Sequence, residues 1–232
     1  SNFLKNPAFP EYSWRIAFLL GFTLSIVGYF IRKKLTETPV FKTIHHAKRS
    51  IPLIDGIRFN KIECLNTALI AAANGTAFYF AVIFLPGYLK QTTNFNTDYL
   101  TLYLTFLVLI GAPLGGFVSD RINRGKLLVI SCTLMAFYLP LMLKIVTTAN
   151  DQRVLMLCLT LYGVIFSVMG ATINTFAIES IPAKYRMSCS SFCYSLGMGL
   201  VGGTVPAVST LIIRWFGEDP IFIGGYISLV CL

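Results

Sequence analysis

The charged residues with the most informative spacing close the third apolar stretch of the chain. Asp120 and Arg121 end this stretch just after Gly116, and Arg124 follows three residues later. A carboxylate at a helix end can bind the positive N-terminus of a neighbouring helix, and arginines can pair with other carboxylates. Such contacts hold one conformation and break in another, so the pattern predicts a conformational latch. The alternative is a helix cap beside ordinary cytoplasmic positive charge.

Uncharged polar residues inside the apolar stretches form a second group of candidates. Because a buried amide without a hydrogen-bond partner is costly, Asn74 and Asn174 are the first candidates for contacts with a solute. Four tyrosines could stack on a quaternary ammonium group through cation–π contacts. These are Tyr79, Tyr103, Tyr162 and Tyr194. The alternative is that the amides join helices and the tyrosines anchor them at the membrane interface.

Each of the two amides belongs to a polar stripe at helical spacing. One stripe comprises Glu63, Asn66, Thr67 and Asn74, and the other comprises Thr160, Ser167 and Asn174. Each stripe predicts one wall of a solute cavity. No charged residue lies in the middle of a predicted span, although intramembrane acids normally mark proton relays. We therefore expect the main proton carrier of a symporter outside this sequence.

The composition indicates that a membrane surrounds these residues. Of 232 residues, 55% are hydrophobic and only 12% are charged, whereas a soluble domain carries about 25% charged residues. This excludes a soluble enzyme, a disordered regulator and a secreted disulfide scaffold. The net charge of +9 fits cytoplasmic loops of a membrane protein better than a nucleic-acid surface. The six cysteines lie in or beside apolar segments without histidine partners, so we expect packing residues and neither a metal nor a cofactor.

The apolar segments predict an all-α membrane protein, because a transmembrane helix needs about 20 apolar residues. Six segments qualify, and a seventh stops after about 13 residues, which is too short to cross. The predicted spans are residues 14–31, 64–89, 99–118, 127–147, 154–178, 191–213 and the truncated 220–232. Gly199 and Gly203, four residues apart in the sixth span, predict close helix–helix approach.

The basic residues predict the orientation of these spans. Alternate connections hold 13 of the 19 Lys and Arg residues, so they belong in the cytoplasm. Residues 32–62 then form a cytoplasmic loop between the last helix of one bundle, in residues 1–31, and a second bundle, residues 63–232. The N-terminus faces outward without a signal peptide. We therefore expect a fragment of a longer multi-pass protein of the cell membrane, the inner membrane in a Gram-negative bacterium.

Several segments together resemble one transporter family. The segment from Gly116 to Lys126 resembles the G-x-x-[SA]-D-R-x-G-R-[RK] loop signature of the major facilitator superfamily, with Asn123 in place of the usual glycine. WRIAFL at residues 14–19, LTETPVF at 35–41 and GGTVP at 202–206 resemble segments of its metabolite:proton symporter family. The E-x-x-P-x-x-x-R element of that family is matched by Glu179, Pro182 and Arg186.

The resemblance implies the C-terminal half of a twelve-helix carrier: helices six to eleven and the start of helix twelve. It implies that the latch contains Gly116, Asp120, Arg121, Arg124, Glu179 and Arg186. It also implies secondary active transport of small organic solutes by proton symport with alternating access, and no enzyme activity. The expected partners are the lipid bilayer, protons, the solute and the missing N-terminal half, and nucleic acid is not among them.

The predicted solute is a zwitterion such as proline or a betaine, because no Arg or Lys lies in the middle of a span to hold a carboxylate. The family also contains citrate, 2-oxoglutarate and shikimate carriers, which keeps a di- or tricarboxylate solute as an alternative. A further alternative is a half-carrier that does not transport.

Overall fold

The computed structural model describes residues 13–34, 52–92, 97, 99–149, 151–217 and 220–232. Every regular element within these ranges is a helix, which confirms the predicted all-α class. The chain divides into two compact units, Ser1–Lys48 and Arg49–Leu232. The first unit contains helix α1, Ser13–Lys34, and its last turn carries Arg32, Lys33 and Lys34. At 1.5 Å per residue, a helix of 22 residues is about 33 Å long.

The second unit contains five helical segments that are long and apolar enough to cross a membrane. These are Lys61–Thr92, Leu100–Arg121, Arg124–Ala149, Gln152–Glu179 and Arg186–Phe216, and they confirm five of the predicted spans. Three are single helices: α6 (Leu100–Arg121), α7 (Arg124–Ala149) and α8 (Gln152–Glu179). A shorter helix, α11 (Pro220–Cys231), occupies the place of the truncated span.

The other two spans each contain a π-helical turn. The first is built from α4 (Lys61–Tyr79), η2 (Phe80–Phe84) and α5 (Leu85–Thr92). The second is built from α9 (Arg186–Leu196), η3 (Gly197–Gly202) and α10 (Gly203–Phe216). A π-helical turn adds a residue to the helix and changes which side chains share a face.

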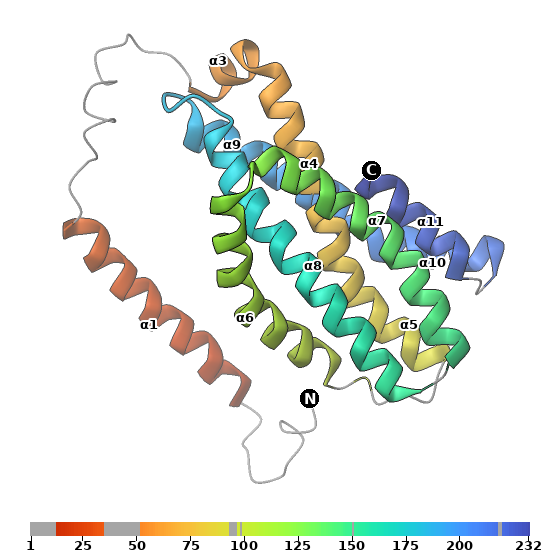
Figure 1. The fold of residues 1–232 in the computed structure, drawn as a ribbon. Coiled ribbons are helices and arrows are strands. Elements are labelled where there is room, and N and C mark those ends of the chain that lie inside the picture. The colour runs from red at the N-terminus through yellow and green to blue at the C-terminus, as the bar shows by residue number, and fades with distance from the viewer. Residues whose placement is uncertain (1–12, 35–51, 93–96, 98, 150, 218–219) are drawn as a thin grey trace. The chain divides into compact units, whose positions relative to one another are not determined.

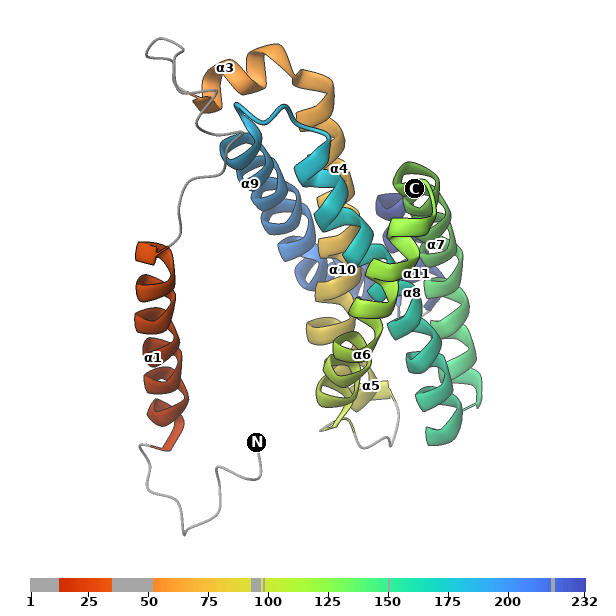
Figure 2. The same cartoon turned by 60° about the vertical axis from the view of Figure 1, so that its left-hand side comes forward.

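Helix α8 packs against α4, α6, α7 and α9 (Figures 1 and 2). Tyrosine hydroxyls join it to its neighbours. Tyr162 donates to the carbonyl of Ala77 in α4 at 2.6 Å, and the hydroxyls of Tyr103 and Thr160 lie 2.7 Å apart between α6 and α8. Large apolar side chains such as Phe106, Phe137 and Leu157 are exposed on the outer faces of the helices, as expected for surfaces that contact lipid.

The closest backbone contact in the bundle lies between α4 and η3. A Cβ atom at Gly197 would overlap the carbonyl of Ala68, and one at Gly202 would lie 2.7 Å from Cα of Gly75. By contrast, Gly199 and Gly203 have nothing within 4 Å of a Cβ position. The prediction that Gly199 and Gly203 make the close approach is therefore wrong. It assumed α-helical spacing, whereas the π-helical turn brings residues five apart onto one face.

One end of the bundle carries α3 and the α6–α7 and α8–α9 connections, and is called here the α3 end. Helix α3 (Pro52–Phe59) packs on the start of α9, because Gly56 leaves room for the side chains of Cys189 and Tyr185. Figures 1 and 2 show α5 at the opposite end. The predicted loop 32–62 thus contains a helix at residues 52–59, and residues 35–51 lie outside the described part.

The cysteines pack as expected from their apolar neighbourhoods. Cys64, Cys189 and Cys193 are buried together with Ile181 beneath α3. All six cysteines are free thiols. In the part of the chain that the structure describes, no group of three His, Cys, Asp or Glu side chains is arranged to hold a metal ion.

Candidate functional site

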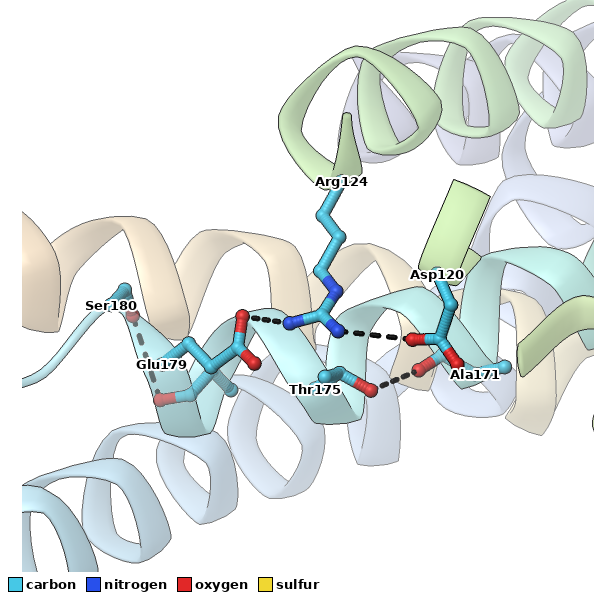
Figure 3. A network of polar contacts seen from close by, with 7 residues as sticks. Asp120, Arg124, Ala171, Thr175, Glu179 and Ser180 are labelled. Carbon is cyan, nitrogen blue, oxygen red and sulfur yellow. Dashed lines mark hydrogen bonds and ion pairs between the residues drawn. The ribbon is translucent and has the colours of Figure 1, made fainter. Parts of the chain in front are cut away.

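Three charged side chains meet at the α3 end and form what we call the Arg124 bridge (Figure 3). One terminal nitrogen of Arg124 donates to Oδ1 of Asp120 at 3.0 Å, and the other pairs with Oε2 of Glu179. The Arg124 side chain is 27% exposed, Glu179 is 53% exposed and Asp120 is 72% exposed. One guanidinium thus joins the ends of α6 and α8 to the first residue of α7.

Local sequence positions each member of the bridge. The extended backbone of Ile122 ends α6, and Oδ1 of Asn123 accepts the backbone N–H of Lys126 at 3.3 Å. This caps the N-terminus of α7, so Arg124 begins the new helix one turn after Asp120. Glu179 is the last residue of α8. The sequence therefore places one acid at each of two helix ends, and a basic residue between them.

The bridge depends on close contact between α6 and α8. A Cβ atom at Gly115 would lie 2.9 Å from the carbonyl oxygen of Ser167, and one at Gly111 would overlap the Ser167 side chain. Gly116, which belongs to the predicted latch, has nothing within 4 Å of a Cβ position. Gly111 and Gly115, rather than Gly116, bring α6 against α8 in this bundle. Their spacing of four residues is the small-residue pattern of helix contacts in membranes.

The two other arginines of the predicted latch lie apart from the bridge. The guanidinium of Arg121 lies over the ring of Phe117, 4.0 Å from its centroid. Nε of Arg186 donates to the carbonyl of Ile181 at 3.2 Å, inside the loop between α8 and α9. The structure therefore brings Asp120, Arg124 and Glu179 together and places Arg121 and Arg186 elsewhere.

The polar stripe on α8 is mainly a contact with α6. Thr160 meets Tyr103, and the buried Ser167 faces Gly111 and Gly115. Asn174, the last member, is exposed and donates to the carbonyl of Gly170 at 2.9 Å. The expectation that all three line one cavity is wrong, because the face that carries Thr160 and Ser167 packs against another helix.

Asn74 and Tyr194 form a polar pair deep between α4 and α9. Asn74 is 5% exposed, and its amide nitrogen donates to the Tyr194 hydroxyl at 3.2 Å. Its amide oxygen is buried with no hydrogen-bond partner in the described part of the chain. Among the other tyrosines, Tyr162 is fully buried against Phe166, and Tyr79 is partly buried beside Phe78. Of the four candidate tyrosines, Tyr194 is the one that pairs with a candidate amide within the described ranges.

A pocket of about 310 Å³ lies between α8 and α9. Six of the residues that line this α8–α9 pocket are polar: Asn174, Arg186, Ser190, Ser191, Tyr194 and Ser195. A pocket of about 580 Å³ beside α4, α7 and α11 is lined almost entirely by apolar side chains. Sequence reasoning missed the three serines. Ser191 and Ser195, one helical turn apart on either side of Tyr194, were the available signal.

The sequence of this chain is similar to those of known membrane transporters. The family model described as "Major Facilitator Superfamily" matches residues 8–203. A citrate-proton symporter of Salmonella typhi is 28% identical over 93% of this chain and 50% of the relative. A putative proline/betaine transporter of Staphylococcus aureus (strain MSSA476) is 24% identical over 98% of this chain and 50% of the relative.

A third relative is the inner membrane metabolite transport protein YhjE of Escherichia coli (strain K12), 26% identical over 92% of this chain and 51% of the relative. This chain therefore spans about half the length of the curated relatives it matches. No solved structure gives a significant match.

Proposed function

The chain belongs to the Major Facilitator Superfamily and is part of a multi-pass cell-membrane protein, and from this premise we propose that the full-length protein is a secondary active carrier. It moves small organic solutes by alternating access and catalyses no chemical reaction. The relatives are named as symporters and transporters, which supports transport over enzyme activity.

The observation that carries this proposal is the Arg124 bridge. A carrier needs contacts that close one side of the membrane in one state and separate in the other. The bridge joins three helices at one end through two partly exposed ion pairs. Partly exposed pairs are weak, so they can bias a conformational balance and still break in every cycle.

The proposed topology follows the resemblance of the sequence. Helix α1 is the sixth transmembrane helix and the last of the N-terminal bundle, in residues 1–31. Residues 32–62 are the cytoplasmic loop, which ends in α3. Residues 63–232 are the C-terminal bundle, with α4 to α10 as helices seven to eleven and α11 as the start of helix twelve. The α3 end is then cytoplasmic, in agreement with its basic residues.

The proposed solute is a small carboxylate-bearing molecule, with proline or a betaine as the first candidate. The polar groups near the middle of the spans, Asn74 and Tyr194, are uncharged, which suits a ligand of low net charge. Citrate is the second candidate, because a relative named citrate-proton symporter is 28% identical. Proton coupling is proposed from the relatives, with the main proton carrier in the N-terminal half.

Uptake by the full-length protein tests the proposal. We expect proteoliposomes to accumulate labelled proline or betaine, and a proton uncoupler to abolish the accumulation. Protein-free liposomes are the control, and citrate and 2-oxoglutarate are assayed in parallel. Citrate uptake without proline or betaine uptake would reject the zwitterion, and uptake that is insensitive to the uncoupler would reject proton coupling.

A further inference from the structure

The α8–α9 pocket contains a cation that no acidic side chain of the described residues contacts. Arg186 lines the pocket, and its Nε is occupied by the carbonyl of Ile181. In the described ranges, both ion pairs involve Arg124, so the Arg186 guanidinium has no carboxylate partner there. Its two terminal nitrogens are suited to hold an oxyanion through paired hydrogen bonds.

The same pocket is also lined by an oriented hydroxyl. Tyr194 lines the pocket two turns further along α9, and its oxygen accepts the N–H of Asn74. Because this oxygen is already an acceptor, the hydroxyl proton remains available for donation. Ser190, Ser191 and Ser195 also line this pocket.

Asn74 orients Tyr194 from behind the residues that line the pocket. This amide is 5% exposed and uses only one of its two polar atoms. Its nitrogen fixes the Tyr194 hydroxyl, which makes Asn74 a positioning residue for the pocket.

We propose that the α8–α9 pocket binds the carboxylate of the transported solute, with Arg186 as its counter-ion and Tyr194 as a second donor. The volume of about 310 Å³ is at the lower end of small-ligand pockets, about 300–1,000 Å³. Proline, betaine, citrate and 2-oxoglutarate all carry the required carboxylate, whereas choline and pyrrolidine do not. This inference rests on the proposed function and names the group of the solute that the C-terminal half recognises.

The proposal is tested by protection of a reporter thiol in the full-length carrier. Ser191 is exposed and lines the pocket, so Ser191→Cys provides a site for maleimide labelling in proteoliposomes. The parent protein measures the background from its native cysteines. We expect proline, betaine, citrate or 2-oxoglutarate to slow the labelling of residue 191, and choline and pyrrolidine to have no effect.

Variants in the Ser191→Cys background identify the groups that bind. Arg186→Gln should raise the solute concentration for half-protection by about tenfold or more, since hydrogen bonds to charged groups are the stronger class. Arg186→Lys keeps the positive charge but loses the paired donors of the guanidinium. Its concentration for half-protection should therefore lie between those of the parent and Arg186→Gln. Tyr194→Phe, which loses one neutral hydrogen bond, should raise the concentration about threefold to tenfold. Lys184→Gln, which removes an exposed charge from the same loop, should leave it unchanged.

The outcomes separate this inference from the proposed function. Equal protection in Arg186→Gln and its parent, or protection by choline or pyrrolidine, overturns the pocket. Protection that follows anionic lipid in the liposomes and ignores added solute also overturns it, because the ligand is then a lipid headgroup. Solute uptake without protection rejects the pocket and leaves the carrier, whereas protection without uptake supports the pocket and rejects the carrier.

Discussion

In the full-length protein, Gly197→Ala is expected to remove most of the folded protein, and Gly199→Ala is expected to leave it intact. The new methyl group at residue 197 would overlap the carbonyl of Ala68 and lie 2.9 Å from the amide nitrogen of Ala72. Both atoms belong to the backbone of α4 and cannot rotate away. Overpacking of this kind typically costs about 1–3 kcal/mol, and occasionally more.

The measurement is thermal unfolding in mild detergent, together with the monodisperse fraction on size exclusion. Gly199→Ala is the matched control, because it makes the same change in the same π-helical turn and meets nothing within 4 Å. Gly202→Ala and Gly203→Ala form a second pair with the same expected contrast. If Gly197→Ala is as stable as its parent, or Gly199→Ala is equally harmful, the packing of η3 on α4 is not as described.

Replacing Arg124 by glutamine is expected to reduce uptake by about tenfold, within the usual range of coupling between conformational states. The variant leaves Asp120 and Glu179 without their shared partner, so the state closed at the α3 end loses both contacts. Arg124→Lys keeps the charge but cannot fork between two carboxylates, and it should fall between glutamine and the parent. Uptake is compared at equal membrane levels of each protein.

Lys126→Gln is the control for this prediction. It removes the same charge from the same turn, and the structure gives Lys126 a backbone contact with Asn123 and no carboxylate partner in the described ranges. We expect near-normal uptake from this variant. Parent-like uptake by Arg124→Gln would leave the bridge as a topological feature without a role in the cycle.

Much of the fold could be predicted because hydrophobic length is a direct signal. Five predicted spans appear as helices with ends within a few residues of the expected positions. The π-helical turns could not be predicted, since Gly197–Gly202 is apolar and rich in glycine in either geometry. That one unrecognised turn exchanged the roles of Gly197 and Gly199. Helix α3 was missed because its eight residues lie in a polar, basic segment that reads as a loop.

The sequence predicted the three members of the Arg124 bridge but not the position of Arg186. Asp120, Arg124 and Glu179 were expected to act together, and the structure brings them into contact. Arg186 was assigned to the same group by motif, but the loop after Glu179 carries it to the α8–α9 pocket. Thr160 and Ser167 have the spacing of a cavity wall. A helix–helix contact has the same spacing as a cavity wall. The packing of α6 against Thr160 and Ser167 identifies this face as a helix contact.

The central claim, that the full-length protein is an alternating-access carrier, is tested most directly by solute counterflow. Proteoliposomes are loaded with an excess of unlabelled solute and placed in a trace of the labelled solute, with the proton gradient collapsed. A carrier that exposes its site to one side at a time should exchange the two, so labelled solute should rise transiently above its external concentration and then decline. A labelled solute that only equilibrates, without this overshoot, would indicate a channel and contradict the account.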